Sequence, residues 1–230
     1  MPRLLLALTL CAAGCGGPPA EPSPRVPDDT LSLLRQAIRQ RLAGALDVTL
    51  ERVELSRFEE DADLYVALFD WQARWWGDFV VFCAADGELR WTAVVSEEDE
   101  PAANYGVSAR GFRLPGFPDP LVEVFWSSHM GNGSLYLYEV RDRSLHLLLE
   151  TTAVDNHWGG DGCIFRGGTL SASYQDVDGD GLSDLTLSGF MDRLTLDADG
   201  DPAGGVSASV PVRQTFLWKA DRRTFERRDP

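Results

Sequence analysis

The stretch YQDVDGDGLSDLTLSG, residues 174–189, places four aspartates within nine positions and then returns to an apolar alternation. Short acidic side chains at alternate positions can converge on one point, and a glycine such as Gly181 allows a sharp bend between them. Carboxylates at this spacing repel one another unless a cation neutralises them. The stretch therefore predicts a cation-binding bend between two β-strands.

The spacing also indicates which atoms would bind the cation. Asp176, Asp178 and Asp180 would supply side-chain oxygens, Leu182 its backbone carbonyl, and Asp184 would complete the shell. An all-oxygen set of this kind suits Ca²⁺, whereas Mg²⁺ prefers to keep several water ligands. Zinc is disfavoured because no histidine or cysteine lies among the ligands. We therefore expect a Ca²⁺ site, and a solvated acidic turn without an ion is the alternative.

The arrangement differs from an EF-hand, which needs a glutamate where this chain has Leu187. It resembles the calcium loop of FG-GAP and VCBS repeats, as in integrin α-chain propellers: a strand, D-x-D/N-x-D-G-x-x-D, and an apolar strand. The matching residues are Asp176, Asp178, Asp180, Gly181 and Asp184, followed by Leu185. The resemblance covers roughly 20 of the 230 residues. It implies a calcium-stabilised β structure, but the chain is too short for a propeller whose blades take about 40–50 residues each.

A second acidic stretch, LDADGDPAGG at residues 196–205, begins in the same way with Asp197, Asp199 and Asp201. Pro202 replaces the turn glycine, and Gly205 stands where the last ligand would be. The stretch is either a second candidate metal site or an ordinary turn.

Most segments around the two stretches are rich in β-branched and aromatic residues, which favours strands. We count about ten or eleven strands joined mostly by short turns, such as Asp86-Gly87, and short turns imply antiparallel sheets. A single helix is indicated near residues 30–42 by an apolar stripe at helical spacing. The sequence thus predicts a mainly β fold over residues 30–230, one calcium-binding domain of antiparallel sheets with one N-terminal helix packed on them.

Residues 1–14 resemble a bacterial lipoprotein signal, with Arg3, a short apolar segment and small residues before Cys15. The resemblance implies that Cys15 is lipidated and becomes the mature N-terminus; ordinary secretion is the alternative. Residues 15–29 form a proline-rich tether. In that family an aspartate directly after the cysteine signals retention in the inner membrane, so Gly16 at this position implies the outer membrane if the cell is Gram-negative. We expect a lipid-anchored protein of the bacterial cell envelope, whose membrane contact is the N-terminal lipid.

The net charge of −15 argues against nucleic acid as a partner and suits cation binding. Beyond the signal and Cys15, the chain keeps Cys83 and Cys163. In an oxidising compartment this pair predicts a disulfide, and two separate buried thiols are the alternative.

The function that these features favour is non-enzymatic: a lipid-anchored β-domain stabilised by Ca²⁺. One alternative is an adhesion or recognition module for an envelope protein or glycan, in which Trp71, Trp75 and Trp76 would be exposed. Another is a hydrolase with a site near His157 and Asp161. The sequence contains no glycine-rich phosphate loop after a strand and no G-x-S-x-G motif.

Overall fold

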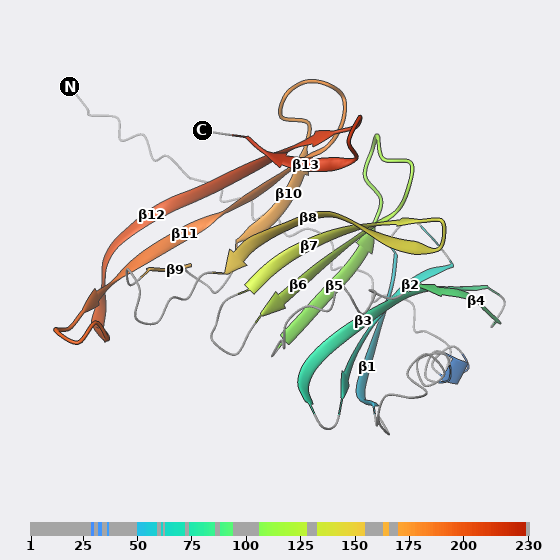
Figure 1. Cartoon of the computed structure of the whole chain (residues 1–230), viewed down its shortest axis with the longest axis horizontal. Helices are drawn as coiled ribbons and strands as arrows, with labels where there is room; N and C mark the ends of the chain where they lie inside the picture. The colour runs from blue at the N-terminus through green and yellow to red at the C-terminus, as the bar shows by residue number, and fades with distance from the viewer. Residues whose placement is uncertain are drawn as a thin grey trace, which may run out of the picture.

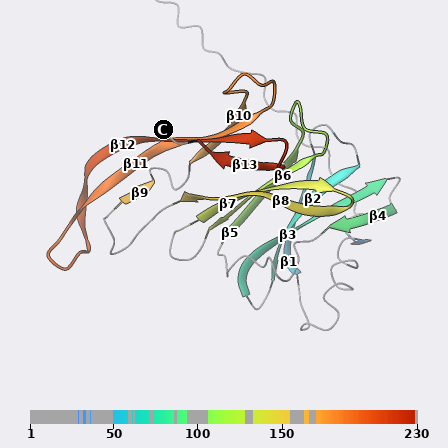
Figure 2. The same cartoon turned by 45° about the horizontal axis from the view of Figure 1, so that its top comes forward.

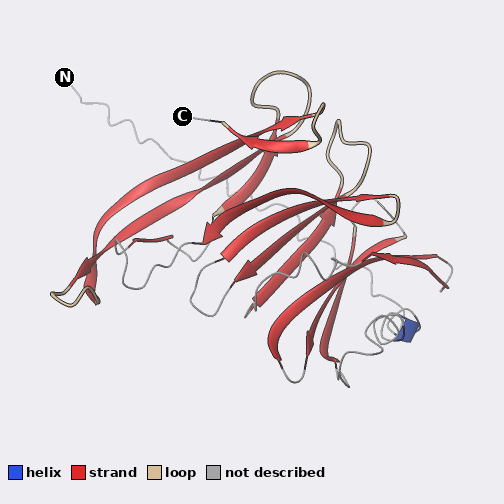
Figure 3. Cartoon of the chain, viewed as in Figure 1, coloured by secondary structure: helices blue, strands red, loops and turns tan. Residues whose placement is uncertain are grey.

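The structure of the chain is a computed structural model, and its described part consists of strands and the loops between them, with few helical positions (Figure 3). The described residues are 50–58, 61, 63–71, 74–85, 88–93, 106–127, 133–154, 163–165 and 170–228, with the single positions 29, 32, 33 and 36. Every pairing between the strands of this part is antiparallel. The predicted class, mainly β with antiparallel sheets, is therefore confirmed.

The strands form three sheets (Figure 1). The N-terminal sheet contains β1 (Leu50–Arg57), β2 (Leu64–Trp71), β3 (Arg74–Ala85) and β4 (Glu88–Ala93) in that order. The middle sheet contains β5 (Gly106–Phe112), β6 (Leu121–Ser127), β7 (Gly133–Arg141) and β8 (Ser144–Val154). The C-terminal sheet contains β10 (Ser171–Gln175), β11 (Asp184–Leu196), β12 (Pro202–Lys219) and β13 (Thr224–Arg227), and β9 (Cys163–Phe165) pairs with β11.

The described part contains thirteen strands, so the expectation of about ten or eleven was too low. The pattern missed β1, β5 and β9. β1 and β5 place charged residues or glycine between few apolar side chains, and β9 has only three residues. Their sequences carry too little apolar alternation to mark a strand, and pairing with a neighbouring strand stabilises them instead.

The middle sheet is buried on both faces. One face of β6 and β7 contributes Val122, Val124, Trp126, Tyr138 and Val140 to a core shared with the N-terminal sheet. The opposite face contributes Leu121, Leu135 and Leu137 to a second core shared with the C-terminal sheet. Because alternate side chains of a strand point to opposite faces, a strand covered on both sides reads as a nearly continuous apolar run. The fold is therefore three layers of sheet with two cores.

Among the described residues, the C-terminal sheet packs most closely on the middle sheet near the start of β11. Near the start of β11, Leu185 and Leu187 are fully buried, and Phe216 and Trp218 of β12 join the same core. The paired strands β11 and β12 then continue as a long ribbon away from the other sheets (Figure 2). The buried end of this sheet is the end that carries the acidic stretch.

Parts of the N-terminal predictions lie outside the described residues. Positions 29, 32, 33 and 36 are helical, but the rest of the helix expected at residues 30–42 is not among the described residues. The predicted signal at residues 1–14 and the tether, apart from Asp29, lie outside them as well. Within the described part, no helix is both long and apolar enough to span a bilayer.

Candidate metal centre

The acidic stretch forms the connection between β10 and β11, which pair directly up to Gln175 and Asp184. Gly179 and Gly181 both adopt φ of +86°, a left-handed conformation that side chains with a Cβ rarely take. Apart from the glycine itself and its two chain neighbours, no residue has an atom within 4 Å of a Cβ built on either glycine, so the backbone conformation rather than lack of space requires glycine here. The sharp bend that the sequence predicted at Gly181 is present.

Backbone N–H groups inside the loop donate hydrogen bonds to all four of its carboxylates, beginning with the three exposed ones. Asp176 accepts bonds from the N–H groups of Gly179, at 2.6 Å, and Gly181, at 2.9 Å. Asp178 accepts one from Asp180 at 3.3 Å, and Asp180 accepts one from Leu182 at 2.8 Å. These donors partly offset the negative charge and orient the side chains, as short acidic residues commonly do in turns.

Asp184, the first residue of β11, is the buried member of the stretch, with only 1% of its surface exposed. Its Oδ2 atom accepts a hydrogen bond from the Val177 N–H at 2.9 Å, which closes the loop. Its Oδ1 atom accepts one from the Trp218 N–H in β12, also at 2.9 Å. A buried carboxylate is costly unless it is hydrogen-bonded, and these two bonds satisfy one lone pair on each oxygen.

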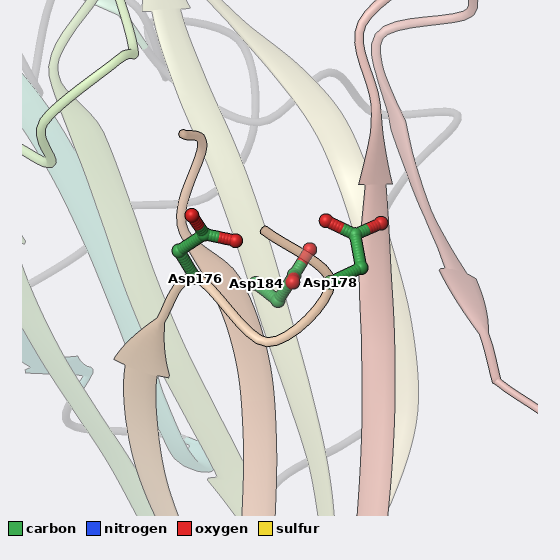
Figure 4. A group of neighbouring side chains, drawn as sticks. All are labelled: Asp176, Asp178 and Asp184. Carbon is green, nitrogen blue, oxygen red and sulfur yellow. The ribbon is translucent and has the colours of Figure 1, made fainter. Parts of the chain in front are cut away.

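Three of the five predicted ligand positions come together. One carboxylate oxygen from each of Asp176, Asp178 and Asp184 lies within 4.8 Å of the others, and Figure 4 shows the three side chains around the bend. Unit charges at this separation repel by about 1–3 kcal/mol per pair at the dielectric of water or a protein surface. Oxygen ligands of this kind fit Ca²⁺. Asp180 is exposed and is not a member of the group.

The second acidic stretch forms a turn between β11 and β12. Asp197 Oδ1 accepts bonds from the N–H groups of Asp199 and Asp201, each at 2.9 Å, and Gly200 supplies a φ of +85°. Over the described residues, the oxygens of Asp197, Asp199 and Asp201 do not form a three-carboxylate group like that of the first stretch. Both hydrogen bonds end on the side chain of Asp197, as in an ordinary Asx turn.

The predicted disulfide between Cys83 and Cys163 is absent, because Cys83 is a free cysteine. Its strand, β3, belongs to the N-terminal sheet, whereas Cys163 begins β9 in the C-terminal sheet, and the middle sheet lies between these two. Burial raises the pKa of the Cys83 thiol above its usual value, and the charges of Asp63 and Asp61 add to this rise. The thiol is therefore protonated at neutral pH and a weak nucleophile.

The remaining predicted site positions fall outside what the structure describes. Cys15, His157 and Asp161 lie outside the described residues, as do the side chains of Trp71, Trp75 and Trp76.

Sequence reasoning missed two polar clusters between the middle and C-terminal sheets. In the first, the Tyr174 hydroxyl donates to Glu123 at 2.7 Å, and Arg110 binds both oxygens of that carboxylate at 2.8 and 3.1 Å. Burial, followed by the charge of Glu123, raises the pKa of Tyr174 well above its usual value.

In the second cluster, Arg223 contacts both Glu139 and Asp119. The sequence signal that could have revealed this cluster is a charged residue inside an apolar strand, as Glu139 is in GSLYLYEVR.

Fold and site together define a three-layered antiparallel β protein with an acidic connection between two strands of its C-terminal sheet. No protein-family model matches the chain, and no curated protein matches it either.

Proposed function

We propose that this protein is a non-enzymatic, lipid-anchored β-domain of the bacterial cell envelope, and that Ca²⁺ bound in the loop between β10 and β11 stabilises its fold. The observation that carries the proposal is the convergence of three carboxylates, one of them the buried Asp184, within 4.8 Å. The FG-GAP-like and VCBS-like spacing of the same residues supports calcium in preference to other cations.

The loop residues would bind the ion in different ways. Asp176, Asp178 and Asp184 would hold the ion, and Asp180 and the Leu182 carbonyl would complete its shell, as the resemblance implies. The bound ion would supply the positive charge that removes the repulsion between the carboxylates. The backbone bonds to Asp176 and Asp184 set the loop in a bent shape before the ion arrives.

A structural role suits these surroundings. The loop joins two paired strands, and its buried ligand bonds to a third strand, so an ion here would hold β10, β11 and β12 together. Ca²⁺ that binds the folded state alone stabilises it by mass action. Extracellular calcium modules have dissociation constants on the order of 0.1–1 mM, and we expect a value in this range.

The place of action follows from the N-terminal sequence. The signal-like residues 1–14, Cys15 and the proline-rich tether support attachment to the outer membrane through lipid, with the β-domain held clear of the bilayer. An envelope protein or glycan is the expected kind of partner, and nucleic acid is not, because the chain is strongly acidic.

Thermal unfolding with and without calcium tests the proposal. At 10 mM Ca²⁺ we expect the melting temperature to lie about 3–10 °C above its value in EGTA. Asp178→Asn should abolish this difference, since it removes an exposed ligand charge and little else. Asp197→Asn is the matched control, because it makes the same charge change in the other acidic turn and should leave the calcium effect intact. Equal melting curves for the unmodified protein in calcium and EGTA would refute the proposal.

A further inference from the structure

The acidic loop of the C-terminal sheet also touches the middle sheet. Gly116 lies in the connection between β5 and β6, residues 113–120, and has φ of +87°. A Cβ built on Gly116 would lie 2.6 Å from Leu182 Cδ2, so the Leu182 side chain occupies the space beside this glycine. Leu182 is half-buried against the core between the two sheets. Leu182, which lies between the candidate ligands Asp180 and Asp184, therefore packs on the β5–β6 connection of the middle sheet.

A second link starts at Asp184. This carboxylate belongs to the candidate ligand group and also accepts the Trp218 N–H at 2.9 Å. The Trp218 ring packs against Phe117 of the β5–β6 connection, with ring centroids 4.7 Å apart, and against Phe225 of β13 at 5.1 Å. The position of the buried ligand is thus coupled to an aromatic cluster that spans both sheets.

A third link closes the same region. Arg223, in the turn between β12 and β13, binds Asp119 of the β5–β6 connection at 3.1 Å. Arg223 also contacts Glu139 of β7, a carboxylate that is 1% exposed. The β5–β6 connection therefore bonds or packs with the C-terminal sheet at Gly116, Phe117 and Asp119.

We propose that these contacts form an inter-sheet clasp, made of Gly116, Phe117, Asp119, Leu182, Asp184, Trp218 and Arg223, which Ca²⁺ in the acidic loop tightens. The inference rests on the proposed function, because calcium is the effector. When the loop holds the ion, its carboxylates are drawn together, Leu182 stays on Gly116, and Asp184 holds Trp218 against Phe117. Without the ion, repulsion between the carboxylates opens the loop and loosens the packing of the C-terminal sheet on the middle sheet.

Linkage requires that the coupling act in both directions. If calcium strengthens the contacts of the β5–β6 connection, damage to those contacts must weaken calcium binding by the same factor. This reciprocity separates a clasp from a calcium site that stabilises its own loop only.

Hydrogen exchange of the full chain, with calorimetric titration of Ca²⁺ in parallel, tests the clasp. At saturating calcium we expect exchange to slow about tenfold or more in residues 113–120 and 216–228 as well as in the acidic loop. Residues of β2 and β3, in the N-terminal sheet, should not change. If calcium binds but protection is confined to residues 176–184, the clasp is wrong and the proposed function stands. If the titration detects no binding, both are wrong.

The variant Leu182→Ala tests the reverse direction. It keeps every carboxylate and the Leu182 carbonyl but removes the side chain that lies on Gly116. We expect calcium affinity to fall about fivefold or more and the protection of residues 113–120 to disappear. Leu194→Ala, the same truncation at a half-buried site on the distal part of β11, is the control and should bind calcium normally. Unchanged affinity and unchanged protection in Leu182→Ala would overturn the clasp.

Discussion

The Asp184 carboxylate accepts a hydrogen bond from the backbone N–H of Trp218, 34 residues further along the chain, and one of its oxygens lies within 4.8 Å of a carboxylate oxygen from each of the exposed Asp176 and Asp178. One buried side chain thereby joins the acidic loop to β12. Asp184 thus closes the acidic loop, bonds to a neighbouring strand and belongs to the candidate metal centre. Substitutions can separate these three roles.

Asp184→Asn should destabilise the protein even in EGTA, by about 2 kcal/mol, because the amide keeps only one acceptor oxygen for two backbone donors and its NH₂ group faces an N–H. In EGTA, Asp178→Asn should be close to neutral or slightly stabilising, because it loses a single 3.3 Å bond at an exposed residue but relieves the repulsion from Asp176 and Asp184. Both variants should lose the stabilisation by calcium. Urea unfolding with and without Ca²⁺ measures both effects; equal costs in EGTA would contradict a special structural role for Asp184.

Gly111→Ala should be severely destabilising, by about 3 kcal/mol or more. A Cβ at Gly111 in β5 would lie 2.1 Å from the ring of Phe58, a residue that is 1% exposed in the core of the N-terminal and middle sheets. A buried ring cannot move aside without disturbing its neighbours.

The matched control for this variant is Gly205→Ala in β12, where the nearest atom to the new Cβ is Thr195 Oγ1 at 3.9 Å. Gly205→Ala should change the free energy of unfolding by less than about 0.5 kcal/mol. A Gly111→Ala protein as stable as Gly205→Ala would show that Phe58 does not fill this space.

Arg223→Met should cost about 3 kcal/mol, because it leaves the buried Glu139 carboxylate without its main cationic partner. The double variant Glu139→Leu, Arg223→Met should recover most of this loss, since no buried charge then remains. Arg222→Met, which removes the exposed pair with Glu226, should cost less than about 0.5 kcal/mol. Additive effects of the Glu139 and Arg223 substitutions in the cycle would contradict a direct coupling.

Cys83 should react slowly with thiol reagents at pH 8 and faster as the pH rises beyond 9, because burial and the nearby charges of Asp63 and Asp61 raise its pKa. The folded state holds the thiol proton more tightly than the unfolded state does. This contribution to stability is therefore complete below the unfolded pKa and is lost as the pH increases through the folded pKa.

The measurement uses a form that starts at Gly16 and carries Cys163→Ser, so that Cys83 is its sole thiol. Urea-unfolded protein gives the reference rate at each pH. A native rate at pH 8 that equals the unfolded rate would contradict the raised pKa. The same form with Cys163 retained is measured without a reducing agent. If its Cys83 does not react with the thiol reagent even after unfolding in urea, the two cysteines form the disulfide that the structure lacks.

The turns show why part of this fold can be predicted from the sequence. The turn at residues 141–144 joins β7 to β8, and its residues Asp142 and Arg143 adopt φ of 51° and 62°. The bend at Gly181 and the hairpin between β3 and β4, whose ends pair at Ala85 and Glu88, are present as well. Each depends on a few adjacent residues, so short-range sequence carries the information.

The acidic loop was predictable to the same extent. The spacing of its aspartates identified Asp176, Asp178 and Asp184, which the structure brings together, but it gave Asp180 equal weight. The backbone hydrogen bonds around the bend leave the Asp180 side chain outside the three-carboxylate group, and only the three-dimensional path of the loop reveals this.

By itself, the sequence determined the β class, the turns and the acidic bend, because strand propensity, glycine conformation and aspartate hydrogen bonding act over a few residues. The tertiary structure alone decided that the middle sheet is covered on both faces, that Cys83 stays a free thiol, and that Asp184 binds Trp218. It also paired Glu139 with Arg223 across 84 residues. Such contacts join distant segments, and their partners are chosen by how whole sheets pack to bury apolar surface, which no short stretch of the chain specifies.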